Sequence, residues 1–132
     1  MRHLPAVLFP ACAAVVLAAC APEVQRASGA ELYASYCASC HGPSGRGDGQ
    51  AAAGQSPRPA DLTRLARDNG GVFPLVSVMS KIDGYKGGPA GMPEFGPALE
   101  GPTVLVDTGD GVMTPTPEPL AALAEHLRLL QR

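Results

Sequence analysis

Residues at helical spacing recur in three parts of the chain, each with signals for where a helix begins or ends. The first part begins at a capping box formed by Ser28 and Glu31. The second covers residues 74–83 and stops at a glycine. The third is expected to begin with Thr116 as its cap and Pro117 in the first helical position. The three stripes are Gly29, Tyr33, Tyr36, Cys37 and Cys40, then Leu75, Val78, Met79 and Ile82, and finally Leu120, Leu123, Leu127 and Leu130.

The connections between these helices are rich in glycine and proline. Residues 42–49 form a glycine-rich loop, and a short helix capped by Asp61 follows a proline-rich loop. Residues 84–96 are too broken for a helix or a strand. Residues 103–106 form a short strand or an extended wall, followed by a turn over residues 107–111. The pattern predicts an all-α domain with a short extended insertion before its last helix.

The first 19 residues predict a leader that is removed from the mature protein. A short basic start precedes an apolar run over residues 4–17, and small residues precede Cys20. The run is short for a transmembrane span, and Pro5 and Pro10 argue against a buried helix. Its end resembles the lipobox of bacterial lipoproteins, which implies cleavage before Cys20 and acylation of that cysteine. Ordinary secretion with cleavage elsewhere is the alternative.

These signals divide the chain into a signal peptide of residues 1–19, a short tether of residues 20–27 and one domain of residues 28–132. Acyl chains on Cys20 would hold the domain on the periplasmic side of a bacterial membrane. The 132 residues carry 10 basic and 12 acidic side chains, a formal net charge of −2. Because no basic patch is present in the sequence, the chain is not expected to bind nucleic acid.

One short motif carries the candidate chemistry. The letters CASCH, which begin at Cys37, have the C-x-x-C-H pattern of c-type haem attachment. Positions i, i+3 and i+4 of a helical turn share one face, so Cys37 and Cys40 can bond the two vinyl groups of one haem while His41 binds the iron. Cys12 is expected to leave with the leader and Cys20 to be acylated, so the pair in the motif remains.

Two other interpretations of this motif are a thiol redox pair and a zinc site. A thioredoxin-like pair requires a βαβ context, which the pattern does not predict. A closed zinc site needs four ligands, and His126 is the one histidine left besides His41 once the leader with His3 is removed. The glycine loop lacks the Lys-Ser/Thr of a phosphate-binding P-loop. It is therefore interpreted as a turn that lets the backbone pass close to a flat ring.

The proline-rich loop before Asp61 is expected to orient His41. A proline carbonyl has no N–H of its own to pair with, so it can accept a hydrogen bond from the ring nitrogen that does not bind iron. Such a bond would fix the tautomer of the histidine ligand. Pro57 and Pro59 are both candidates, and the sequence does not choose between them.

Four features, CASCH, the glycine-rich turn, PADL and GMPEFG, together resemble the class I cytochromes c over residues 28–131. The resemblance implies three to five helices around one covalently bound haem c, with the first and last helices crossing. It also implies that the sixth iron ligand is Met92, in a Met-Pro-x-Phe-Gly-like loop. Met113 is the competing candidate, because residues 97–115 are a longer link to the last helix than is usual in this family. An aromatic residue is common in relatives where this chain has His126.

The site implies the function. A haem with His41 and Met92 as axial ligands has both positions filled, so it passes single electrons and does not bind a substrate. We therefore expect a membrane-anchored, monomeric electron carrier that is not an enzyme and that shuttles between redox partner proteins. One alternative is a haem subunit of a periplasmic oxidoreductase complex, with residues 97–115 used for docking. Another is a haem-based sensor or ligand binder, which would need an open iron position.

Overall fold

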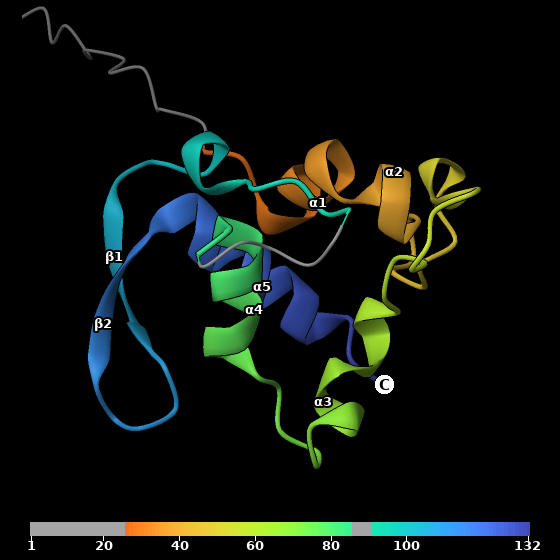
Figure 1. Cartoon of the computed structure of the whole chain (residues 1–132). Coiled ribbons are helices and arrows are strands. Elements are labelled where there is room, and N and C mark those ends of the chain that lie inside the picture. Colours follow the sequence, from red (N-terminus) through yellow and green to blue (C-terminus); the bar gives the residue numbers. More distant parts are fainter. Residues whose placement is uncertain (1–25, 86–90) are drawn as a thin grey trace, which may run out of the picture.

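The computed structural model describes residues 26–85 and 91–132 (Figure 1). The predicted signal peptide, Cys20 and the predicted tether up to residue 25 lie outside the described residues, as do residues 86–90. In the part that is described, no helix combines the length and the apolar character needed to cross a bilayer. The elements, in chain order, are α1 (Gly29–Tyr36), α2 (Ala38–His41), η1 (Gln50–Ala52), η2 (Leu62–Arg64), α3 (Leu65–Asp68), α4 (Leu75–Asp83), η3 (Gly96–Ala98), β1 (Thr103–Asp107), β2 (Met113–Pro117) and α5 (Glu118–Leu129).

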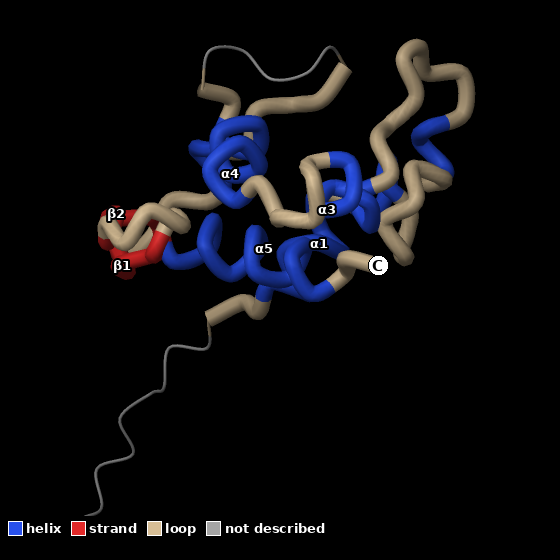
Figure 2. Tube along the Cα trace, turned by 90° about the horizontal axis from the view of Figure 1, so that it is seen from below, coloured by secondary structure: helices blue, strands red, loops and turns tan. Residues whose placement is uncertain are grey.

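The helices α1 and α5 pack directly against each other (Figure 1 and Figure 2). A Cβ atom placed on Gly29 would lie 2.1 Å from the carbonyl oxygen of Ala122 and 2.9 Å from the Cβ of His126. One turn further along α1, the ring of Tyr33 lies 5.3 Å from the ring of His126. The close approach therefore requires a glycine at position 29, and His126 is a packing residue of the contact between the two helices.

The hydrophobic core joins α1, α4 and α5. The stripes predicted for the second and third helices are confirmed, with Leu75 and Leu130 half-buried at the edge of the core. The helix α4 ends at Gly84, which adopts a left-handed conformation with φ of +91°. The buried cluster consists of Leu32, Tyr33, Cys37, Val78, Met79, Ile82, Leu99, Leu120, Leu123, Ala124 and Leu127.

The first helix begins as predicted but ends earlier. Glu31 N donates to Ser28 Oγ at 3.3 Å and Ser28 N donates to Glu31 Oε2 at 2.7 Å, which confirms the capping box. The single helix expected to run through Cys40 is divided at Cys37, where φ is −116° and ψ is −37°. The Cys37 carbonyl accepts both Cys40 N and His41 N, at 3.2 Å and 2.8 Å. A separate helical turn therefore begins at this residue and carries the motif.

A two-stranded antiparallel sheet is added to the helical domain (Figure 1). The strand predicted over residues 103–106 is confirmed as part of β1, and its partner β2 places Thr116 opposite Val104. The predicted turn follows β1, because the Asp107 carboxylate accepts Gly109 N at 2.8 Å and Gly111 N at 3.3 Å. The second strand was not predicted from the sequence.

This sheet corrects the predicted start of the last helix. Thr116 lies in β2, where its hydroxyl donates to Thr114 O at 3.1 Å, and it does not cap α5. Pro117 precedes the helix instead of occupying its first position. The N–H of Glu118, the first residue of α5, donates to Pro102 O at 2.8 Å. The strand pairing thus satisfies a donor that a threonine cap would have served.

Gly29→Val should lower the free energy of unfolding by about 1–3 kcal/mol, because the added atoms would overlap the Ala122 backbone. Ala30→Val is the matched control, since Ala30 is exposed in the same helical turn. Denaturant unfolding of the haem-loaded protein compares the two variants. An equal loss in both would show that the approach of α1 to α5 does not depend on the glycine.

Candidate haem site

The two motif cysteines lie at the start and within the turn α2. Cys37 is buried, with 6% of its surface exposed, and Cys40 is half-buried. Both thiols are free, not joined in a disulfide. Since α2 is a single helical turn, Cys37, Cys40 and His41 are placed at positions that share one helical face. This arrangement fits attachment of one haem edge through two sulfurs.

The imidazole of His41 is oriented by the backbone of a distant loop. Its Nδ1 lies 2.9 Å from the carbonyl oxygen of Ala60. A carbonyl can only accept, so Nδ1 carries the proton and the lone pair is on Nε2. An imidazole in this tautomer can bind a metal through Nε2 while its other nitrogen is held in place. The donor set therefore fits haem iron.

The acceptor is not one of the two prolines that were expected. Pro57 and Pro59 were the candidates, and the structure assigns this role to Ala60. The Pro59 carbonyl oxygen instead faces Gly47, where a Cβ atom would lie only 2.3 Å from it. Because the Pro59 carbonyl packs against the glycine loop, it is the next carbonyl along the chain, that of Ala60, that accepts the hydrogen bond from His41.

The glycine-rich loop folds back on α2. Gly47 N donates to His41 O at 2.8 Å, and Gly49 N donates to Cys40 O at 3.1 Å. A Cβ atom on Gly49 would lie 2.3 Å from the Ser39 carbonyl oxygen, so this position requires a glycine. Because these N–H groups bind carbonyls of the motif turn, they are not arranged to hold phosphate, in agreement with the missing P-loop residues.

The hydroxyl of Tyr33 holds the other end of the same turn. It donates to Gly42 O at 2.5 Å, and Gly42 also ends α2 with φ of +78°. Burial raises the pKa of Tyr33 to about 12, with the negative charges of Cys37 and Asp48 in their ionised forms adding to the effect. Tyr33 therefore stays a neutral donor at neutral pH.

The buried thiol of Cys37 does not have the properties of a reactive redox thiol. Burial raises its pKa to about 11, and the neighbouring Cys40 adds to the rise. Disulfide exchange uses the thiolate, so this pKa makes Cys37 a poor redox thiol at neutral pH. Within residues 26–85 and 91–132, no three His, Cys, Asp or Glu side chains are gathered as a metal site.

The two candidate methionines lie in different surroundings. Met92 is half-buried and packs against the hydrophobic core. Its loop is joined to α4 by Phe95 N, which donates to Ile82 O at 2.9 Å, and the Phe95 ring lies 5.9 Å from the ring of Tyr36. Tyr36 directly precedes Cys37, so the Met92 loop approaches the motif. Met113 begins β2 and is 52% exposed.

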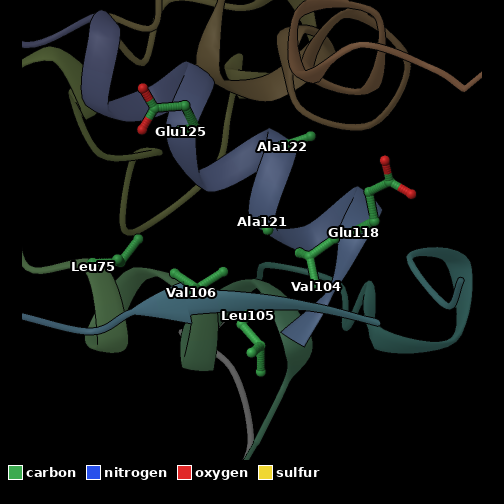
Figure 3. Close-up of a pocket in the computed structure, with 8 residues that line it drawn as sticks. All are labelled: Leu75, Val104, Leu105, Val106, Glu118, Ala121, Ala122 and Glu125. Carbon is green, nitrogen blue, oxygen red and sulfur yellow. The ribbon is translucent and has the colours of Figure 1, made fainter. Parts of the chain in front are cut away.

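A separate cavity lies between β1 and α5 (Figure 3). Its volume is about 380 Å³, and Val104 and Val106 face Ala121 and Ala122 across it. None of the predicted haem-binding residues lines this cavity. It belongs to the contact between the added sheet and the last helix.

Sequence reasoning missed two groups in this site. The Ala60 carbonyl is a backbone group, and no pattern of side chains in the sequence predicts which carbonyl accepts from His41. The hydrogen bond of the Tyr33 hydroxyl was not predicted because Tyr33 was interpreted only as part of the apolar stripe of the first helix. Its spacing of nine residues from Gly42, the first glycine after the motif, was a signal that a polar group could reach the end of the turn.

A helical domain with a C-x-x-C-H turn and an oriented histidine has the features of a c-type cytochrome. Residues 24–104, more than half of the chain, match the family described as cytochrome c oxidase, cbb3-type, subunit III. The chain belongs to this family of c-type cytochromes, which implies covalently bound haem c with iron and a role in electron transfer. Domains of this family generally face the periplasm and associate with membranes. No curated protein and no solved structure gives a significant match.

Tyr33→Phe should lower the free energy of unfolding by about 1 kcal/mol at neutral pH, because the buried Gly42 carbonyl loses a donor. Tyr36→Phe is the control, since it removes the same atom from a ring that is 38% exposed. Denaturant unfolding of the haem-loaded proteins measures both.

Loss of the Tyr33 hydroxyl should also change how the free energy of unfolding depends on pH. A phenol whose folded-state pKa is raised contributes stability that is fully present below pH 10 and is lost as pH rises through about 12. The stability of the wild type should therefore fall more steeply over this alkaline range than that of Tyr33→Phe. Parallel curves would contradict the raised pKa.

Proposed function

We propose that this protein is a membrane-anchored electron carrier with one haem c, attached through Cys37 and Cys40 and ligated by His41 and Met92. The observation that carries the proposal is the hydrogen bond from His41 Nδ1 to Ala60 O at 2.9 Å, which leaves Nε2 as the metal-binding atom. When bound, haem with these two ligands supplies a one-electron iron couple whose ferrous state the thioether favours.

The surroundings of the motif support this use. Cys37 is itself part of the buried apolar cluster, and Met92 and Phe95 pack against the same cluster. An apolar enclosure limits access of water and lowers the local dielectric, and both affect a redox potential. The residues of this chain would thus hold the cofactor, orient its histidine ligand and exclude solvent.

Met92 is favoured over Met113 as the second axial ligand. Its half-buried position near the start of the motif supports a role at the iron, whereas Met113 is exposed on the added sheet. If His41 and Met92 both bound the iron, no coordination site would be left for a substrate, and the protein would transfer electrons without being an enzyme by itself.

The proposed anchor is an acylated Cys20. Arg26, the first described residue, forms an ion pair with Glu118 at 3.1 Å. The six Cα-to-Cα steps from Cys20 to Arg26 can span at most about 20 Å when extended. Acylation would therefore keep the haem domain close to the outer face of the cytoplasmic membrane, within reach of membrane-bound redox partners.

A second candidate function is that of a haem subunit within an oxidoreductase complex. The family description as subunit III of a cytochrome c oxidase favours it. The chemistry at iron would be the same, but the protein would copurify with one partner instead of existing as a monomer that shuttles. The insertion of residues 97–115, which includes β1, would then be available for docking.

Met92→Ala should abolish the weak sulfur-to-iron absorption band at the red end of the visible spectrum, because the thioether ligand is lost. Met113→Ala is the matched control and should keep the band. If only Met113→Ala loses it, the ligand assignment is wrong. If the wild type lacks the band, the iron has an open coordination position or a different ligand, and the sensor or ligand-binder interpretation replaces electron transfer.

Cys20→Ser should release the haem protein from the membrane into the soluble periplasmic fraction, because no acyl chain can be attached. Fractionation followed by mass spectrometry of the mature N-terminus measures both location and modification. A variant whose leader has been removed but which stays in the membrane fraction after a high-salt wash would contradict the lipid anchor.

A further inference from the structure

Gln131 and Arg132, which follow α5, form hydrogen bonds with residues 61–66, the segment directly after Ala60. Gln131 Nε2 donates to Leu62 O at 2.8 Å, and Gln131 Oε1 accepts Ala66 N at 2.8 Å. The same amide also donates to Leu127 O at 2.7 Å, which fixes the side chain to its own helix. In both views the C-terminal end lies beside α3 (Figure 1 and Figure 2).

Arg132 adds a second connection to the same segment. Its main-chain N donates to Thr63 O at 3.1 Å, and its Nε donates to Thr63 Oγ1 at 2.8 Å. The Thr63 hydroxyl in turn donates to Asp61 Oδ1 at 2.6 Å, and the Arg132 guanidinium lies 3.8 Å from Asp61 Oδ2. Thr63 is only 4% exposed, so its hydroxyl, at the centre of this relay, is shielded from competing water.

The contacts satisfy backbone groups that the local structure leaves unpaired. Ala66 is the second residue of α3, so its N–H has no partner within that helix. A glutamine amide has both a donor and an acceptor, and Gln131 uses both toward one segment. Such a two-sided contact fixes position more tightly than a single hydrogen bond.

The fixed segment leads directly to the histidine. Asp61 follows Ala60, whose carbonyl accepts from His41 Nδ1. On its other side the segment is joined to the glycine loop by Leu62 N, which donates to Gly45 O at 2.7 Å. The Ala60 carbonyl therefore directly precedes a segment that is held both by the glycine loop and by the two residues after α5.

We propose that Gln131 and Arg132 are positioning residues for His41, a role that rests on the haem ligation proposed above. They hold residues 61–66 so that the Ala60 carbonyl meets the Nδ1–H. Weakening this hold lengthens or breaks the hydrogen bond, which lowers the electron donation from the imidazole to iron and so raises the reduction potential.

The test uses the haem-loaded protein with Gln131→Ala, Arg132→Ala and the double variant. Hydrogen exchange of the His41 Nδ1–H is followed by NMR in the reduced state, and the reduction potential by spectroelectrochemical titration. Exchange should be faster by about tenfold in the double variant, as loss of about one hydrogen bond predicts. Its potential should shift upward. Gln131→Glu keeps the acceptor for Ala66 N and loses the donor to Leu62 O, so its shift should be intermediate.

Two controls separate positioning from general stability. Arg128→Ala removes a cation that pairs with Glu125 on the same helix, at 2.6 Å, and should change neither readout. Asp107→Ala weakens the turn after β1, where the Asp107 carboxylate accepts Gly109 N and Gly111 N, and it should leave the potential unchanged. The single variants provide the test if the double variant fails to fold.

The outcomes distinguish this proposal from the proposed function. An unchanged exchange rate and potential in Gln131→Ala and Arg132→Ala, with the sulfur-to-iron band present throughout, would overturn the positioning role and leave the ligation intact. A wild type without that band would overturn the ligation itself. Equal potential shifts in Asp107→Ala and the double variant would assign the effect to stability, and that result also overturns the proposal.

Discussion

The orientation of one imidazole by one carbonyl is the constraint on which the site depends. The hydrogen bond between His41 Nδ1 and Ala60 O closes a loop of 18 intervening residues. Such a bond contributes only about 1 kcal/mol net, whereas ordering each loop residue costs about 1–2 kcal/mol. It cannot hold the loop by itself. The loop has to be ordered by its own backbone bonds, such as Gly47 N to His41 O, so that the carbonyl is already in place.

The packing of α1 against α5 is connected to this site through Tyr33. The ring of Tyr33 lies against His126 at the approach of the two helices, while its hydroxyl holds Gly42 at the end of the motif turn. Gly29 permits the backbones to come close enough for this ring to be buried. The same side chain thus transmits the helix packing to the turn that carries Cys40 and His41.

Local signals in the sequence predicted what local interactions determine. The capping box at Ser28 and the glycine stop at Gly84 are satisfied within a few residues, so both were found. The start of α5 was misplaced because its first N–H is satisfied by the carbonyl of Pro102, just before β1, and the sequence pattern did not predict the partner strand β2. The choice of Ala60 over Pro59 depends on which carbonyl packs against Gly47, and that is a tertiary contact.

The prolines of β2 show how this insertion forms without losing hydrogen bonds. The bond from Glu118 N to Pro102 O continues the β1–β2 register one residue beyond both strands, and in an antiparallel register hydrogen-bonded pairs recur at every second residue. Val104 with Thr116 is then a hydrogen-bonded pair, whereas Pro115 and Pro117 fall between such pairs, where an N–H would point away from β1. A proline at these positions removes no bond from the ladder and leaves the outer edge of β2 poor in donors. The edge therefore resists pairing with another strand, and β2 can lead directly into α5.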